Sequence, residues 1–401
     1  MAALLRFIVF LELPYNPVMD ARWYHAVAVS LAAGHGFSFI GDLTAYRPPG
    51  YPFLLSLTYR LLGSNFYWAW IWGGVSTAIV ILTTYYIAQR QYGAVVARLA
   101  TIAIAVYPAL VLQTGQAMSD LAFLAGLLLL VSFILSSFPP RLLHVAIIGI
   151  ALGLLTLTRG VAIALVGIVP VIWLIQRMEI KRLVTASVVL GLIFVISLTP
   201  WMLRNYSVFG RFTLGTNTGI NAYIGNNPRA TGGYDLDAPR LARERHLNES
   251  ELDQVLLREV VAFVSTHPVD AFLLLPGKFA NLYLLETSAA TSFFQGQRTY
   301  SSLKKYTLYG VTQFCYLALL ILFCFRVLDL FTATNRPQGI QWVGWILVSY
   351  FTFLALIFFG TDRFRLPILP WMLIESSVFL FRTVARSGIA KGVPEGTEKA
   401  G

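Results

Sequence analysis

Charged residues are scarce in this chain. They make up 12% of its 401 residues, whereas hydrophobic types make up 57% and the mean hydropathy is +0.68. A soluble domain is about one quarter charged, so this composition argues against an ordinary soluble enzyme. Apolar stretches that approach the roughly 20 residues needed to cross a bilayer recur along the chain. We therefore expect an all-α polytopic membrane protein that forms a single transmembrane domain over residues 1–401.

Cysteine is nearly absent, and acidic residues are few. The two cysteines, Cys315 and Cys324, lie in one apolar run, which argues against a disulfide framework or a zinc-ligand spacing. The 30 lysines and arginines outnumber the 19 acidic residues, which gives a net charge of +11. Because no nucleic-acid-binding motif is present, we attribute the excess to basic cytoplasmic loops and contacts with anionic membrane lipids. Nucleic acid is not an expected partner.

The apolar runs predict about ten transmembrane helices. The first is short and contains Arg6, and it has neither a basic start nor a signal-peptide cleavage site, so we interpret it as a span shortened at its start. A further apolar stretch, 269–286, contains proline, glycine, lysine and glutamate, which favours an interfacial or re-entrant segment. The predicted spans are 1–13, 66–88, 96–112, 120–137, 142–157, 161–176, 183–200, 306–326, 341–360 and 365–382.

Lysines and arginines in the short loops predict the orientation. With both termini in the cytoplasm, the basic loop at 176–182 and the tail at 383–401 fall on the inner side. The outer side of the cell inner (plasma) membrane then receives two long segments. These are a first exoplasmic loop, 14–65, with amphipathic interfacial helices, and a longer segment, 201–305, before the last three spans.

Seven arginines fall on the predicted outer side, against the usual bias, and most of them lie at a helix end. A guanidinium group presents a planar fork of donors that matches phosphate. Each arginine could instead reach lipid headgroups or pair with a carboxylate. As a set they indicate a site for a phosphate-bearing lipid. The seven are Arg22, Arg47, Arg159, Arg204, Arg211, Arg363 and Arg365.

The first exoplasmic loop contains a candidate base. Trp23, Val27 and Leu31 form an apolar stripe at helical spacing, which predicts an amphipathic helix over 20–33. Asp20 begins this helix at the membrane surface, where a carboxylate could accept a proton from an acceptor group. From the residues alone, the capping of the helix N-terminus is the role that we favour for Asp20.

A proline-rich turn ends the first loop. Residues 47–52 read Arg-Pro-Pro-Gly-Tyr-Pro, and the prolines restrict the residues before them. The turn predicts a second interfacial helix at 53–62. Its role could be structural alone, or Arg47 could point into an active site.

These motifs, in this order, resemble the GT-C glycosyltransferases, in the branch related to the protein O-mannosyltransferases and the aminoarabinose transferase. The resemblance covers almost the whole chain. Each motif is weak alone, and the order and spacing make the resemblance specific. The residues and motifs that carry the resemblance are Asp20, Tyr24, Gly-His-Gly-Phe at 34–37, the turn at 47–52, Leu-Thr-Arg-Gly at 157–160, residues 199–206, Gly-Asn-Asn-Pro at 225–228 and residues 363–370.

The resemblance implies a multi-span helical fold, a first-loop carboxylate as catalytic base and a polyprenyl-phosphate sugar as donor. It favours the catalytic role of Asp20 over the capping role. Several relatives have an Asp-Glu pair here, whereas Ala21 follows Asp20. Asp120, at the outer end of a predicted span, is our candidate for a second acid, with helix capping as the alternative. Whether the two aspartates share a divalent metal is left open.

We expect transfer of the sugar by a single inverting displacement. The leaving phosphate needs positive charge near it, and our candidates for binding it are Arg204, Arg363 and Arg365, followed by Arg159. The candidate sugar or acceptor pocket comprises Tyr24, Arg47, Tyr51, Asn226 and Asn227. The two asparagines could instead simply make turns.

Two other functions share some of these features. A transporter or flippase of a lipid-linked sugar would also have many spans and arginines, but we find no internal repeat. A non-catalytic assembly subunit of the cell envelope would tolerate replacement of Asp20. The acceptor is a lipid, glycan or protein, and the sequence does not select the sugar.

Overall fold

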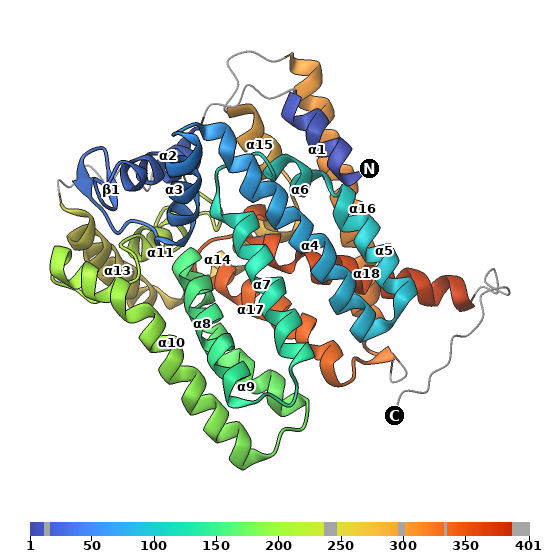
Figure 1. The fold of residues 1–401 in the computed structure, drawn as a ribbon. Coiled ribbons are helices and arrows are strands. Elements are labelled where there is room, and N and C mark those ends of the chain that lie inside the picture. Colours follow the sequence, from blue (N-terminus) through green and yellow to red (C-terminus); the bar gives the residue numbers. More distant parts are fainter. Residues whose placement is uncertain (12–16, 236–246, 296–300, 333–334, 387–401) are drawn as a thin grey trace.

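The computed structural model describes residues 1–11, 17–235, 247–295, 301–332 and 335–386 (Figure 1). Within these ranges the chain is helical apart from one antiparallel hairpin, β1 (Ser38–Phe39) and β2 (Asp42–Leu43), in the first loop. The expected all-α class is confirmed. Parts of the two predicted exoplasmic segments, at 14–16, 236–246 and 296–300, and residues 387–401 of the predicted tail lie outside the described residues.

Within the described residues, six helices are long and apolar enough to cross a bilayer, which makes this a multi-pass integral membrane protein. They include α4 (Ala69–Tyr92, extended by η1, Phe66–Trp68), α7 (Ser119–Ser136), α10 (Ile180–Phe209), α16 (Ser302–Asp329), α17 (Trp342–Ile357, preceded by η4, Gly339–Gln341) and α18 (Leu369–Arg386, preceded by η5, Asp362–Ile368). Each coincides with a predicted span.

The other four predicted spans are shorter apolar helices, so the structure supports six or seven spans rather than ten. The predicted span 96–112 is divided at Tyr107, because Pro108 disfavours a helical residue before it. The short helices are α1 (Ala2–Leu11), α5 (Ala94–Val106, followed by α6, Pro108–Gln113), α8 (Leu142–Thr158) and α9 (Leu165–Ile175, preceded by η2, Gly160–Ala162).

A bent pair of helices supplies the seventh candidate span. Helices α13 (Glu249–Thr266) and α14 (Pro268–Tyr283) meet at 107°. Pro268 begins the second helix, where its missing N–H is not needed. The stretch expected at 269–286 as an interfacial or re-entrant segment is thus a helix turned sharply from its predecessor.

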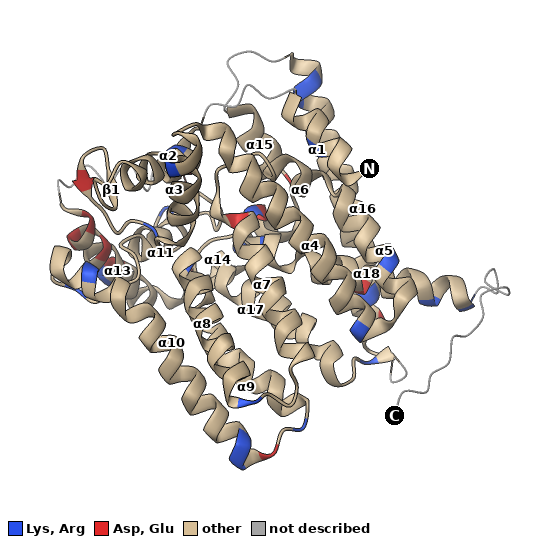
Figure 2. Cartoon of the chain, viewed as in Figure 1, with Lys and Arg blue, Asp and Glu red and all other residues tan. Residues whose placement is uncertain are grey.

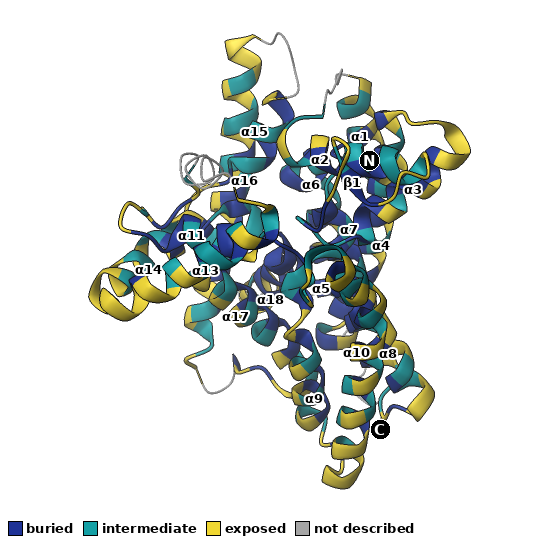
Figure 3. Cartoon of the chain, turned by 90° about the vertical axis from the view of Figure 1, so that its left-hand side faces the viewer, coloured by how far each residue is buried: buried dark blue, intermediate teal, exposed yellow. Residues whose placement is uncertain are grey.

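Charge and burial follow the membrane-protein pattern. Figure 2 shows long uncharged stretches along α4, α7, α8 and α10, with lysines and arginines mostly near helix ends. Figure 3 shows buried residues gathered between the helices and exposed residues on their outward faces. On α10 the outward residues are apolar, among them Val188, Leu192 and Ile196. Such a surface is suited to contact with lipid.

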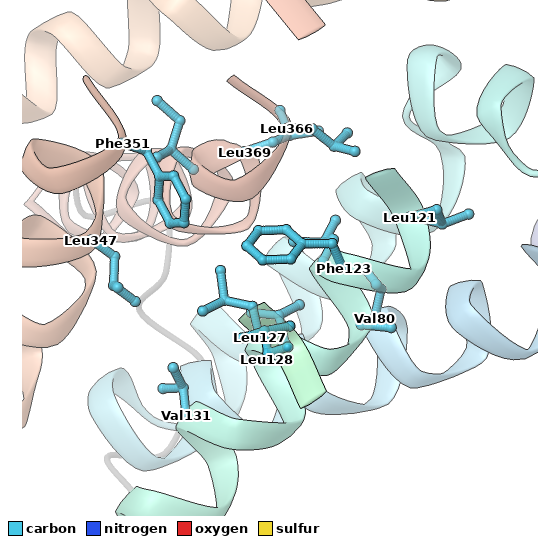
Figure 4. Packing of buried hydrophobic residues seen from close by; sticks show 14 of the residues in the cluster. Val80, Leu121, Phe123, Leu127, Leu128, Val131, Leu347, Phe351, Leu366 and Leu369 are labelled. Carbon is cyan, nitrogen blue, oxygen red and sulfur yellow. The ribbon is translucent and has the colours of Figure 1, made fainter. Parts of the chain in front are cut away.

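Helix α7 lies at the centre of the packing. It packs against α4 and α8. Phe123 of α7 points toward Phe351 of α17, with ring centroids 6.2 Å apart (Figure 4). Leu366 of η5 belongs to the same buried cluster. This packing holds η5 against the first turn of α7.

Two helices of the first loop lie beside the end of the bundle where α7 begins (Figure 1). They are α2 (Met19–Ala32), which begins one residue before the predicted helix, and α3 (Gly50–Leu62). Gly50 approaches the end of α8 so closely that a Cβ atom there would lie 2.7 Å from the Thr158 hydroxyl. The glycine of the proline-rich turn therefore lets α3 pack beside Arg159. Two short helices, α11 (Thr218–Gly225) and α15 (Ser288–Gln295), complete the described elements.

Candidate active site

Five side chains from separate segments form one ionic network where α2, α7, α8 and η5 meet. Arg363 of η5 is its centre: Nη1 lies 2.6 Å from Oδ2 of Asp20, and Nη2 lies 2.8 Å from Oδ2 of Asp120. Arg47 pairs with the other oxygen of Asp20 at 2.5 Å, and Arg159 pairs with Asp120. We call these five residues the Arg363 network.

Neither aspartate caps its helix. Asp20 and Asp120 are each the second residue of their helices, α2 and α7, and no side chain caps either helix N-terminus. The capping interpretation of both residues is therefore wrong. Their carboxylates are used for contacts between segments that are far apart in the sequence.

The two aspartates differ in access. The side chain of Asp20 is 27% exposed, whereas that of Asp120 is 4% exposed. Both oxygens of each carboxylate are paired with a guanidinium group, and Arg363 also donates from Nε to Oδ1 of Asp120 at 2.9 Å. Asp20 is thus the more exposed of the two carboxylates, and an incoming group that reaches it displaces a guanidinium group.

Aromatic side chains surround Arg47. Its guanidinium carbon lies 5.5 Å from the ring centroid of Tyr24 and 5.4 Å from that of Tyr46. Tyr24 also shares a hydrogen bond of 2.9 Å with the hydroxyl of Ser119, which joins α2 to the start of α7. Tyr51 is buried, with its ring 5.3 Å from that of Tyr24. The pocket residues Tyr24, Arg47 and Tyr51 therefore lie together beside Asp20.

The network is electrostatically unbalanced. Three guanidinium groups face two carboxylates, so one positive charge is left over. Burial raises the pKa of the Asp20 carboxyl, but the charges of Arg47 and Arg363 outweigh burial and hold the pKa below its ordinary value. The arrangement can attract an anion, and Asp20 is ionised in the state described here.

The neighbouring residue fixes the position of Arg363. Asp362 accepts hydrogen bonds from the backbone N–H groups of Thr287 and Ser288 and from the Ser288 hydroxyl, at the start of α15. It also accepts from the backbone N–H of Arg363 at 3.0 Å. A carboxylate at a helix N-terminus is stabilised by the exposed N–H groups and the helix dipole. This contact anchors the segment that carries Arg363.

Two predicted phosphate-binding arginines lie outside the network. Arg204 donates to the carbonyl of Thr44 at 2.8 Å and to that of Phe37 at 3.1 Å, next to the β1–β2 hairpin. Arg365 is 1% exposed, pairs with Glu286 at 2.6 Å and donates to the Leu285 carbonyl at 3.0 Å. In this structure both guanidinium groups form structural contacts between segments that are distant in the sequence.

The two predicted sugar-contacting asparagines are also occupied. Asn226 donates to the Ile357 carbonyl at 2.9 Å and accepts from Lys278 at 2.7 Å. Asn227 donates to the Tyr223 carbonyl at 2.7 Å. These contacts fit the alternative that the asparagines shape turns. The sequence interpretation did not include Ser119, Lys278 or Glu286 among the site and supporting residues, because each is a single polar residue without a motif of its own.

The aspartates offer little room for a divalent cation. Arg363 lies between them and bonds to both, so a cation there would have to displace a guanidinium group. The described residues contain no group of three or more His, Cys, Asp and Glu side chains that could hold a metal. The arginines are therefore the source of positive charge that the geometry offers.

The chain has the fold of the GT-C glycosyltransferases, as its motifs indicated. It matches the oligosaccharyltransferase of Archaeoglobus fulgidus tethered to an acceptor peptide, with a TM-score of 0.56, 12% identity and coverage of 98% of this chain and 50% of that one. For the same organism's oligosaccharyltransferase AglB, in complex with an inhibitory peptide and a dolichol-phosphate, the TM-score is 0.54 at 12% identity, with coverage of 100% and 51%.

ArnT from Cupriavidus metallidurans bound to undecaprenyl phosphate matches with a TM-score of 0.45 at 14% identity, covering 99% of this chain and 80% of that one. In contrast, the chain spans only about half the length of the two oligosaccharyltransferase structures. No family model and no curated protein sequence matches it.

Proposed function

We propose that this protein is a glycosyltransferase that moves a sugar from a polyprenyl-phosphate donor to an acceptor on the exoplasmic face of the membrane. The observation that carries the proposal is the Arg363 network: a reachable carboxylate beside an excess of guanidinium charge. The GT-C fold supports it, and a matched structure of that fold holds a dolichol-phosphate. The proposed orientation puts both termini in the cytoplasm and the network outside.

The residues divide into two roles. Asp20 is the base: it accepts the proton of the acceptor O–H or N–H while that oxygen or nitrogen bonds to the anomeric carbon. The bond from that carbon to the phosphate oxygen breaks in the same step, with inversion. Arg363 and Arg159 stabilise the negative charge of the polyprenyl phosphate that leaves. Asp120 is a positioning residue that holds both arginines.

Donor binding would also change the basicity of Asp20. In the described state its pKa is depressed, which makes it a weak base. A donor phosphate competes with Asp20 for the Nη1 atom of Arg363, and loss of that contact raises the pKa of Asp20. Asp20 thus becomes a better base when a donor is bound. Arg204 and Arg365, which are engaged elsewhere, take supporting roles in this proposal.

The test is transfer of radiolabelled sugar from polyprenyl-phosphate donors in membranes that contain the full-length protein. We expect Asp20→Asn to lower the transfer rate about 100- to 10,000-fold, since the acceptor loses its base. The matched control is Asp42→Asn, which changes an exposed carboxylate of the same loop and should leave transfer intact. Equal rates in Asp20→Asn and wild type would remove Asp20 from the mechanism. Absence of transfer from every donor would favour a flippase or an assembly subunit.

A further inference from the structure

A carboxylate outside the Arg363 network holds the backbone that leads to Arg47. Glu249, in the first turn of α13, accepts a hydrogen bond from the backbone N–H of Ala45 at 2.5 Å and one from the Thr44 hydroxyl at 2.8 Å. Thr44 and Ala45 are both buried. The two bonds end on different oxygens of Glu249. The whole carboxylate is thus used to fix two consecutive residues, just before Arg47.

Two further contacts leave this backbone little freedom. Arg204 donates to the Thr44 carbonyl at 2.8 Å, and the Ala45 carbonyl accepts from the backbone N–H of Thr216 at 2.9 Å. Like the carboxylate on α13, these partners lie in the predicted exoplasmic segment 201–305. The residues that they hold belong to the first loop. The contacts therefore join the two predicted exoplasmic segments beside the candidate base.

The start of α13 is itself anchored. Asp253, one turn after Glu249, accepts from the backbone N–H of Gly219 at 2.6 Å, which joins α13 to α11. A Cβ atom on Gly219 would lie 2.1 Å from the backbone carbonyl oxygen of Asp253, so only glycine permits this approach. Arg211, which follows α10, donates to the Ser250 carbonyl at 3.1 Å. Glu249 thus projects from a fixed helix, and such a side chain holds its partner precisely.

Arg47 is the residue through which this hold reaches Asp20. Its Nη2 atom lies 2.5 Å from Oδ1 of Asp20, and Arg363 pairs with the other oxygen. In the proposed function the donor phosphate draws Arg363 away from Asp20. Arg47 is then the guanidinium group that stays on Asp20, where its charge favours the ionised carboxylate. The position of Arg47 therefore affects how readily Asp20 takes up a proton.

The charged groups near the two carboxylates fall into separate sets. Those that face Asp20, directly or through another member of the network, are Arg47, Arg363, Asp120 and Arg159. Those near Glu249 are Arg204 and Asp253. Within the described ranges, no hydrogen bond or ion pair joins Glu249 to the Arg363 network. Its path to Asp20 runs through the backbone and Arg47.

We propose that Glu249 is a positioning residue: through the backbone of Thr44 and Ala45 it holds Arg47 against Asp20. This role rests on the proposed function, in which Asp20 is the base and Arg363 turns to the donor phosphate. Glu249 makes no contact with the reacting atoms. The second exoplasmic segment nevertheless takes part in the reaction, because it fixes a charge beside the base.

The test is the pH profile of kcat for the full-length protein in membranes, with polyprenyl phosphates that carry glucose, mannose or arabinose as donors. The acidic limb of kcat reports the base in the donor-bound complex. Arg47→Gln should move this limb up by about 1–3 pH units, as for loss of a neighbouring opposite charge. Glu249→Ala loses both bonds to the backbone and should move it up by about 0.5–1 pH unit. Glu249→Gln keeps one acceptor and should have a smaller effect.

The direction of the shift separates positioning from a direct effect of charge. Removal of the negative charge of Glu249 would by itself favour ionised Asp20 and move the limb to lower pH. Loss of the hold on Arg47 moves the limb to higher pH. In the double variant of Glu249→Ala and Arg47→Gln, the limb should lie where Arg47→Gln alone places it, because residues that act through one contact are not additive.

Two variants control for changes in structure. Glu251→Gln changes an exposed carboxylate in the same turn of α13 and should leave both the limb and the melting temperature unchanged. Gln91→Leu removes a buried amide that donates to the Ile340 carbonyl at 2.8 Å. That variant should melt at a lower temperature without moving the limb, which shows that lower stability alone causes no shift.

A measurement without turnover separates failure of this role from failure of the proposed function. Part of the stability difference between wild type and Asp20→Asn is lost in acid, and this part should be smaller in the Glu249→Ala background, because a less depressed pKa of Asp20 stabilises the folded state less. An unchanged part would overturn the hold on Arg47, whether or not transfer occurs.

The pH profiles give the remaining outcomes. A limb that stays in place or moves to lower pH in Glu249→Ala, while Arg47→Gln moves it up, would overturn the role of Glu249 and leave the proposed function standing. Absence of transfer from every donor by the wild type would overturn the proposed function, and the stability difference would then decide the hold on Arg47 alone.

Discussion

Two clusters of charged side chains in this protein differ in exposure and balance. In the Arg363 network the three arginines and Asp20 are 19–27% exposed, and guanidinium groups outnumber carboxylates. A second cluster joins α16 to α18, where Arg326 pairs with Glu375 at 2.9 Å. These two side chains are 0% and 4% exposed. Asp329 and Arg382, whose side chains are 11% and 29% exposed at its edge, balance its charge, with two positive and two negative groups.

The difference shows what each cluster can do. A balanced cluster with a buried central pair is an internal contact between helices, since its charges already neutralise one another. An accessible cluster with surplus charge can still lower its energy by binding an anion. Counting charged residues in the sequence would not distinguish them, whereas exposure and balance do.

The largest expected effect is that substitutions in the two clusters impair different properties of the protein: transfer in the Arg363 network and stability in the second cluster. Arg363→Gln should lower transfer per folded molecule about 100- to 1,000-fold, because the leaving phosphate loses its main counter-charge. Arg326→Gln should lower the free energy of unfolding by about 3–5 kcal/mol, because Glu375 is left buried without its counter-charge, and transfer per folded molecule should persist. Initial rates and thermal unfolding in detergent measure both. The control is Arg22→Gln, which changes an exposed arginine of α2 and should alter neither transfer nor stability. Loss of transfer per folded molecule in Arg326→Gln would contradict the distinction between the two clusters.

Removal of one hydroxyl group from each cluster gives a smaller contrast. Tyr92 donates to Glu375 at 2.5 Å, so Tyr92→Phe should cost about 1.5–3 kcal/mol of unfolding free energy, as for a bond to a charged group. Tyr24 bonds to a neutral hydroxyl, and Tyr24→Phe should cost about 0.5–1.5 kcal/mol. Denaturation of the two variants under the same conditions gives the comparison. A larger loss for Tyr24→Phe would contradict it.

The pH dependence of the Arg363 network follows from the depressed pKa of Asp20. A carboxyl whose pKa is lower in the folded state stabilises the protein above its unfolded value, near 3.9, and this contribution is lost as the pH falls through the folded pKa. The stability difference between wild type and Asp20→Asn should therefore be full at pH 6 and shrink in acid. Arg47→Gln should shift the acidic limb of the transfer rate to higher pH. A limb that stays in place would mean that Arg47 does not set the pKa of Asp20.

The smallest expected effect is that of chelation. Since Arg363 lies between the two carboxylates, we expect EDTA to leave the transfer rate unchanged. The rate is measured with and without added Mg²⁺ or Mn²⁺. Loss of transfer in EDTA that either metal restores would show that a cation supplies charge that we assign to the arginines.

The sequence predicted the helical class and the first-loop helix because both depend on composition and periodicity over many residues. It could not separate Arg363 from Arg365, which share one motif. The structure forms a 3-10 helix at Asp362–Ile368, where residues two apart point in different directions. One guanidinium therefore enters the network and the other enters the core beside Glu286. That outcome depends on the packing of α7, α15 and η5, which no local pattern encodes.

Asp120 also has a consequence for the end of the reaction. It is a resident anion that occupies the same guanidinium groups that a phosphate would use. In the reaction that we propose, the polyprenyl phosphate left after sugar transfer competes with Asp120 for Arg159 and Arg363. On that proposal, Asp120 favours release of the lipid, so that product binding does not limit the turnover rate.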